Sequence, residues 1–177
     1  MATANLKIQT GPLVVSRVYP AARELVFRAW SSADHVKRWF CPSGYSVPEA
    51  TVDFCIDGAF EICMRSPEGH DHWTKGRFTE ITPHSRLAID MNVVGDRDQL
   101  LFRAHTVATF ADVAGGTRLE VTQTYTLLES SAASMLEGAP RGWSQTLDRL
   151  DHELARIQET PAGRSIGGQA LKSAPIP

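Results

Sequence analysis

The sequence predicts one α+β domain in which a curved antiparallel β-sheet wraps around a long C-terminal α-helix. Between the turn at 41–44 and about residue 126, apolar residues alternate with polar ones, as in strands that bury one face. Short turns separate these segments, which indicates antiparallel neighbours, because a parallel pair needs a crossover of a dozen or more residues. The last periodic segment carries a single apolar stripe at helical spacing, and the sheet is the only large surface that can bury it.

The N-terminal part predicts a strand followed by two short helices. Residues 1–11 are polar and are expected to form a flexible lead-in, whereas Leu13–Val18 is rich in residues typical of strands. Pro20 suits the first turn of a helix, because the N–H that proline lacks is not needed there. Ser31 or Ser32 can cap a second short helix.

A predicted hairpin decides which side chains face the long helix. Residues 67–69 can form a three-residue loop, since the glycine that ends it tolerates the left-handed conformation. With this loop Met64 lies opposite His72, so His72 and Thr74 face the helix and Trp73 faces away. A four-residue loop would reverse the faces and bury Trp73, because a slip of one residue inverts a strand. The sequence favours the three-residue loop.

The remaining strands repeat the two-residue period. Their expected inward side chains are Phe60, Ile62 and Met64, then Leu87, Ile89 and Met91, then Thr106, Ala108 and Phe110, and finally Leu119, Val121, Gln123 and Tyr125.

The long helix is expected to begin at Pro140, with no more than a turn or two of helix before a break at Gly138. Arg149 and Glu153 fall on its polar side and are expected to form an i, i+4 ion pair. The apolar stripe steps by four and three residues through Trp143, Leu147, Leu150, Leu154 and Ile157. We therefore place the domain at 12–158 and expect residues 159–177 to be disordered, since they hold few large apolar groups.

Composition narrows the function classes. The net charge is −2 and no run of Lys or Arg exists, so nucleic acid is not an expected partner. No apolar run approaches the roughly 18 residues of a membrane span, and the first residues do not resemble a signal peptide. Cys41, Cys55 and Cys63 show no paired spacing, which favours reduced thiols in a cytoplasmic protein.

The order of elements, together with several short motifs, resembles the helix-grip fold of the START/Bet v 1-like (SRPBCC) superfamily. Within it, the chain is similar to the C-terminal domain of the Hsp90 ATPase activator homologue (AHSA1-like). One departure is clear: such domains often carry a His just before the Gly-Trp of the last helix, and here the residues before it are 138–141. The matching stretches are 14–40, 67–81, 86–87, 106–110, 115–119 and 142–150.

This resemblance implies an apolar cavity between the sheet and the long helix, since better-known relatives bind lipids, steroids or polyketides and some cyclise polyketides. Our first hypothesis is therefore a protein that binds a small hydrophobic molecule. The alternatives are an enzyme of the polyketide cyclase/aromatase type and a protein-interaction module with a chaperone as one partner considered. A homodimer is a separate option for the assembly. A role as an Hsp90 co-chaperone is disfavoured, because the true activator also depends on a separate N-terminal domain.

His72 is the leading polar candidate in this cavity, as a hydrogen-bond donor or, in an enzyme, as the acid–base group. A histidine bonded to a neighbouring side chain without any chemistry is the plainer interpretation. Gln123 interrupts an apolar face, so it bonds either protein or ligand. No cofactor or metal site is expected, because Cys63 faces away from His72. The candidate ligand contacts are Trp39, Phe40, Phe60, Ile62, Met64, His72, Thr74, Phe78, Met91, Thr106, Phe110, Gln123, Trp143 and Leu147.

Overall fold

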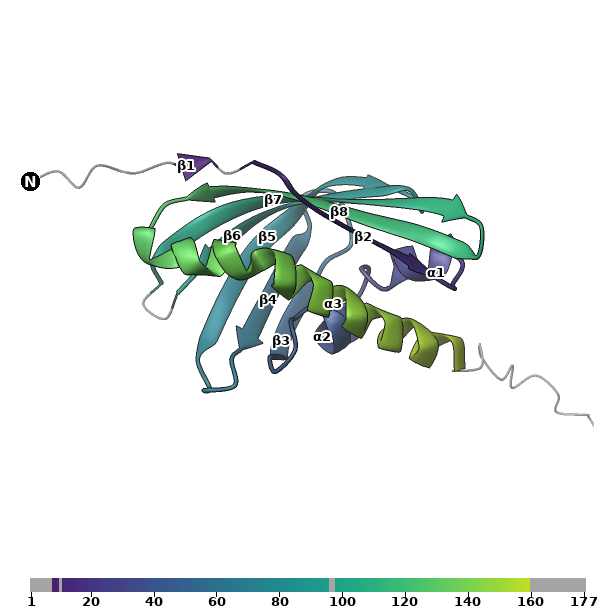
Figure 1. Cartoon of the computed structure of the whole chain (residues 1–177), viewed down its shortest axis with the longest axis horizontal. Coiled ribbons are helices and arrows are strands. Elements are labelled where there is room, and N and C mark those ends of the chain that lie inside the picture. The colour runs from purple at the N-terminus through teal and green to yellow at the C-terminus, as the bar shows by residue number, and fades with distance from the viewer. Residues whose placement is uncertain (1–7, 10, 96–97, 160–177) are drawn as a thin grey trace, which may run out of the picture.

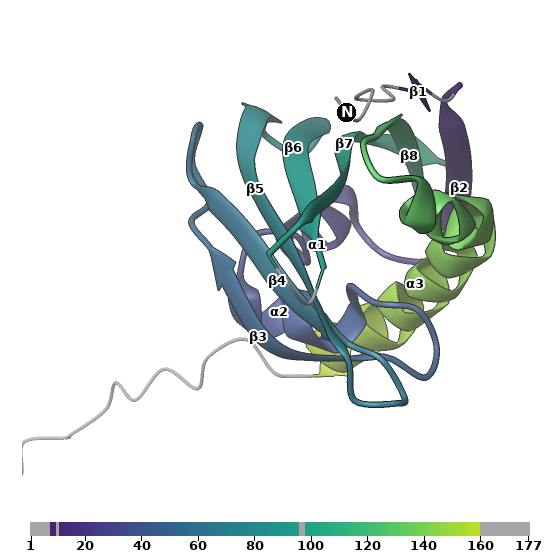
Figure 2. The ribbon, with the colours of Figure 1, turned by 90° about the vertical axis from the view of Figure 1, so that its left-hand side faces the viewer.

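The computed structural model describes residues 8–9, 11–95 and 98–159. Its strands form one antiparallel sheet in the order β1-β8-β7-β6-β5-β4-β3, with β2 also paired to β8. The sheet forms a curved wall, and the long helix α3 lies across its open side (Figures 1 and 2). This is the α+β arrangement that the sequence predicts.

The elements follow in chain order with the bounds β1 Ile8–Gln9, β2 Leu13–Tyr19, α1 Arg23–Arg28, α2 Ala33–Trp39, β3 Ser46–Val52, β4 Ala59–Arg65, β5 Asp71–Thr82, β6 Arg86–Val94, β7 Leu100–Val113, β8 Gly116–Leu127, the 3-10 helix η1 Ser130–Ala132 and α3 Ala133–Glu159.

The N-terminal elements differ in detail from the prediction. Within the expected lead-in, β1 pairs with β8, and residues 1–7 and 10 lie outside the described residues, as does most of the expected C-terminal tail. Helix α1 begins at Arg23 rather than near Pro20, because Ala22 is still extended. Ser32 caps α2 as expected, with its hydroxyl accepting from the backbone N–H of His35.

The β4–β5 hairpin has the predicted register. Met64 lies opposite His72, and Gly69 in the loop has a φ of 89°, the conformation that favours glycine. Trp73 therefore lies on the outer face of the sheet, where the ammonium group of Lys75 is 5.9 Å from the centroid of its ring.

One end of the space inside the sheet is filled by aromatic side chains. Trp30 and Trp39 meet edge to face with ring centroids 4.9 Å apart, and Phe40 meets Phe60 in the same way at 5.2 Å. Helix α2 contributes Trp39 and contacts both β3 and α3. This solid core fixes α3 relative to the sheet.

Helix α3 corrects the sequence prediction at its start. It begins at Ala133, runs through Gly138 without a break and contains Pro140 in its interior. Leu136 and Ala139 pack against the core from these first turns, and such tertiary packing outweighs local propensity. Pro140 has no N–H, so the helical bond to the carbonyl oxygen of Leu136 cannot form.

We expect Pro140→Ala to raise the free energy of unfolding by about 2 kcal/mol, because it restores that bond at an exposed position. Urea unfolding would measure the change. Glu137→Ala, also exposed on α3, is the matched control and should change the value by a few tenths of a kcal/mol. A lower stability of Pro140→Ala would contradict the expectation.

The predicted pair of Arg149 with Glu153 is wrong. Glu153 is 3% exposed and accepts hydrogen bonds from His35 of α2 and Arg156 of α3. Arg149 instead donates to the backbone carbonyl oxygens of Tyr45 and Arg38. Helix α2 covers this side of α3, so the buried face of α3 is wider than its apolar stripe.

Candidate functional site

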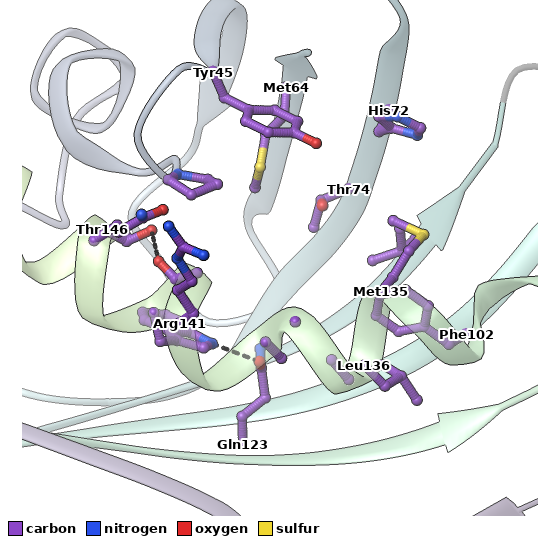
Figure 3. Close-up of a pocket in the computed structure, with 18 of the residues that line it drawn as sticks. Tyr45, Met64, His72, Thr74, Phe102, Gln123, Met135, Leu136, Arg141 and Thr146 are labelled. Atoms are coloured by element: carbon purple, nitrogen blue, oxygen red, sulfur yellow. Dashed lines mark hydrogen bonds between the residues drawn. The ribbon is translucent and has the colours of Figure 1, made fainter. Parts of the chain in front are cut away.

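A cavity of about 520 Å³ lies between the inner face of the sheet and the N-terminal half of α3, and it opens to solvent. Its walls come from β4 to β8, from the loop between α2 and β3, and from α3 (Figure 3). The volume falls within the range of small-molecule sites.

Small side chains explain why this space is not filled. Thr74 and Ala104 line the cavity on the sheet side. At the filled end of the interior, by contrast, the buried side chains include large aromatic rings. Gly138, Ala139 and Gly142 line it on α3. Because these residues lack bulk on both sides, sheet and helix enclose a volume that their side chains cannot occupy.

The walls are mainly apolar. The side chains that give them this character are Met64, Met91, Val93, Phe102, Met135 and Leu136. Methionine is flexible and polarisable, so these walls can adapt to apolar ligands of different shape.

Gln123 ties the sheet to α3 at the cavity floor. Its Nε2 donates to Oγ1 of Thr106 at 2.6 Å. Its Oε1 accepts from Nε1 of Trp143 at 2.7 Å and also from the hydroxyl of Tyr125. Both lone pairs of Oε1 are thus occupied by protein donors, which leaves a ligand only the second N–H of the amide. We refer to Gln123, Thr106, Tyr125 and Trp143 as the Gln123 cluster.

Tyr125 of this cluster stays protonated at neutral pH. Burial raises the pKa of Tyr125 to about 12, and the opposing effect of Trp143 is smaller. Its hydroxyl donates to Gln123, so its oxygen can still accept a hydrogen bond from a ligand.

His72 lines the cavity from β5, as predicted. Its Nδ1 is buried and has no hydrogen-bond partner among the described residues. By contrast, Nδ1 of His105 on the outer face is 2.6 Å from Oδ1 of Asp90. A histidine that moves protons usually has such a partner to orient its ring and fix its tautomer, and His72 has none in the described part of the chain.

Arg141 is the main residue that sequence reasoning missed. It lies on α3 at the cavity and is exposed. The prediction placed a break at Gly138 and the start of the long helix at Pro140, and it assigned no inward direction to Arg141. A signal did exist, because Arg141 immediately precedes Gly142-Trp143, where related domains often carry a histidine.

The structure divides the predicted contacts into two groups. Those that line the cavity are Phe40, Met64, His72, Thr74, Met91, Gln123 and Trp143. Those that do not line it and are buried elsewhere are Trp39, Phe60, Ile62, Phe78, Thr106, Phe110 and Leu147. The second group is mostly aromatic and aliphatic core, while Thr106 acts through Gln123.

No three His, Cys, Asp or Glu side chains among the described residues are grouped so that they could hold a metal ion. None of the described helices combines the length and apolar character that crossing a bilayer requires.

Comparison with known proteins places these features in a family context. The sequence model of the family described as Activator of Hsp90 ATPase homolog 1-like protein matches residues 20–155. No curated protein matches the chain significantly.

Solved structures with the same fold come from several bacteria. A protein from Rhizobium leguminosarum has a TM-score of 0.72 at 22% identity, covering 85% of this chain and 99% of its own. A protein from Chromobacterium violaceum has a TM-score of 0.70 at 24% identity, covering 81% and 96%. An AHSA1 protein from Silicibacter pomeroyi has a TM-score of 0.70 at 23% identity, covering 83% and 99%. At this identity the likeness shows the fold, which confirms the helix-grip prediction.

Proposed function

The chain belongs to the Activator of Hsp90 ATPase homolog 1-like family, and from this premise we propose that it binds a small, mostly hydrophobic molecule between the sheet and α3. The observation that carries the proposal is the open cavity of about 520 Å³ with mainly apolar walls. Among the polar side chains that line it, Gln123, Tyr125 and Trp143 are already bonded to one another in the Gln123 cluster.

The arrangement favours binding over catalysis. A cyclase-like enzyme would use His72 as its acid–base group, yet no described carboxylate holds that ring. The hydrogen bonds of the Gln123 cluster likewise connect α3 to the sheet and are made within the protein. A preformed site with mainly apolar walls, in which Gln123 is already bonded to protein, is suited to a ligand that contributes apolar surface.

The test is to narrow the cavity and measure the affinity for an uncharged apolar probe, N-phenyl-1-naphthylamine. Val93 lines the cavity from β6, and its neighbour Asn92 is exposed on the other face of the strand. Val93→Trp should weaken binding at least tenfold, because the indole occupies the volume that the probe needs. Asn92→Trp is the matched control and should leave the affinity unchanged.

Fluorescence titration gives both affinities, and circular dichroism verifies that the two variants are folded. Equal affinity of Val93→Trp and the unmodified protein would show that the probe binds elsewhere, and absence of binding to the unmodified protein would overturn the proposal. Native mass spectrometry of protein purified from its own host would then identify a bound molecule directly.

A further inference from the structure

The charges at the cavity have one sign. Among the described residues that line it, Arg141 is the only permanently charged side chain, and none of them is Asp or Glu. The guanidinium of arginine stays protonated in proteins. The cavity therefore combines mainly apolar walls with one fixed positive charge, that of Arg141 on α3 (Figure 3).

Arg141 is not used by the fold. It forms no hydrogen bond or ion pair with the described residues, and its near acidic neighbour on α3, Glu137, is exposed and does not line the cavity. The other arginines of α3 are engaged, since Arg149 donates to two backbone carbonyl oxygens and Arg156 pairs with Glu153. Of the three arginines of α3, only Arg141 has all of its N–H donors available to a ligand.

An arginine with free donors beside an apolar cavity matches a carboxylate. Its planar fork can donate two parallel N–H bonds to the two carboxylate oxygens, a pairing stronger than a neutral hydrogen bond. Arg141 is exposed, so head group and guanidinium stay partly hydrated and little desolvation opposes the pairing.

The rest of such a ligand would lie in the interior. Phe102 and Met91 are buried wall residues, and Leu136 lines the cavity from α3 five residues before Arg141. A chain or ring system attached to the carboxylate can therefore contact apolar side chains while its head group stays at Arg141.

We propose that the natural ligand is a carboxylic acid with an apolar body, bound with its carboxylate on Arg141. This rests on the proposed function and narrows it to one chemical class. Arg141 is the residue that determines specificity, and the apolar walls supply the remaining affinity.

The test compares two probes of equal chain length, decanoate and decanol, by isothermal titration calorimetry at pH 8 and below their aggregation concentrations. The unmodified protein should bind decanoate about tenfold more tightly than decanol. In Arg141→Met this preference should disappear through weaker decanoate binding, while decanol binding stays the same. Arg141 is exposed, so the variant should fold normally.

Arg103→Met is the matched control, because Arg103 is exposed on β7 and does not line this cavity. It removes the same charge from the protein and should retain the tenfold preference. If decanol binds as tightly as decanoate, or if Arg103→Met acts like Arg141→Met, the carboxylate assignment is overturned while the proposed function stands. If neither probe binds, the proposed function itself fails.

Discussion

Replacing Gln123 by leucine is expected to lower the free energy of unfolding by about 3 kcal/mol, because it leaves two buried donors without their acceptor. These donors are Nε1 of Trp143 and the hydroxyl of Tyr125, both of which bond Oε1 of Gln123. Leucine has a similar size, so the loss reports hydrogen bonding rather than a new cavity. Urea or thermal unfolding gives the value.

Thr122→Leu provides the matched control, since Thr122 neighbours Gln123 on the other face of β8 and should change stability by no more than about 0.5 kcal/mol. A double-mutant cycle measures the contribution of the hydrogen bond between Gln123 and Trp143. Combining Gln123→Leu with Trp143→Phe should cost less than the two single changes added, because both remove the same bond. An additive result, or a loss below about 0.5 kcal/mol for Gln123→Leu, would show that the cluster contributes little.

The second large effect concerns the buried carboxylate of Glu153. Replacing both His35 and Arg156 by alanine should lower the free energy of unfolding by about 3 kcal/mol, because a buried charge then loses its principal partners. Glu153→Gln should cost only about 1 kcal/mol, since it removes that charge and keeps the shape. Chemical unfolding of both variants tests this asymmetry. The reverse order of losses would mean that Glu153 is hydrated or otherwise compensated.

The same group gives a pH dependence whose sign can be worked out. Burial acts to raise the pKa of Glu153, but hydrogen bonds from Arg156 and His35 outweigh it and hold the pKa below the ordinary value of 4.5. A carboxyl with a lowered folded-state pKa stabilises fully above its unfolded-state pKa and loses that contribution as pH falls through the folded-state value. Stability measured from pH 6 down to pH 3 should therefore fall less steeply in Glu153→Gln than in the unmodified protein.

Most of the sheet, and the position of half of the candidate residues on the cavity wall, could be predicted from sequence, since the two-residue period reports directly which side chains share a face. The hairpin register followed from one residue, Gly69, because its loop position needs a positive φ. This placed His72 and Thr74 on the cavity wall correctly. Periodicity could not separate wall from core, so Phe60 and Phe78 were grouped with Met64 and Met91.

The errors in α3 share one cause. Gly138 and Pro140 disfavour helix locally, so the prediction started the helix too late and overlooked Arg141. Glu153 was assigned to solvent because charge in sequence normally indicates exposure, whereas α2 and its His35 create a polar environment that only the tertiary fold provides. Both cases depend on contacts between segments far apart in the chain.

The two halves of helix α3 differ in how firmly they are anchored in the core, and this difference affects how a molecule reaches the cavity. Leu147, Leu150 and Leu154 anchor the second half in the core, whereas the first half contains Gly138 and Pro140 and spans the cavity. Segments with weak local structure and few buried contacts open without global unfolding. Local unfolding of the first half, up to the hydrogen bond between Trp143 and Gln123, would therefore open a passage to the cavity. The second half, anchored in the core, would keep the protein folded.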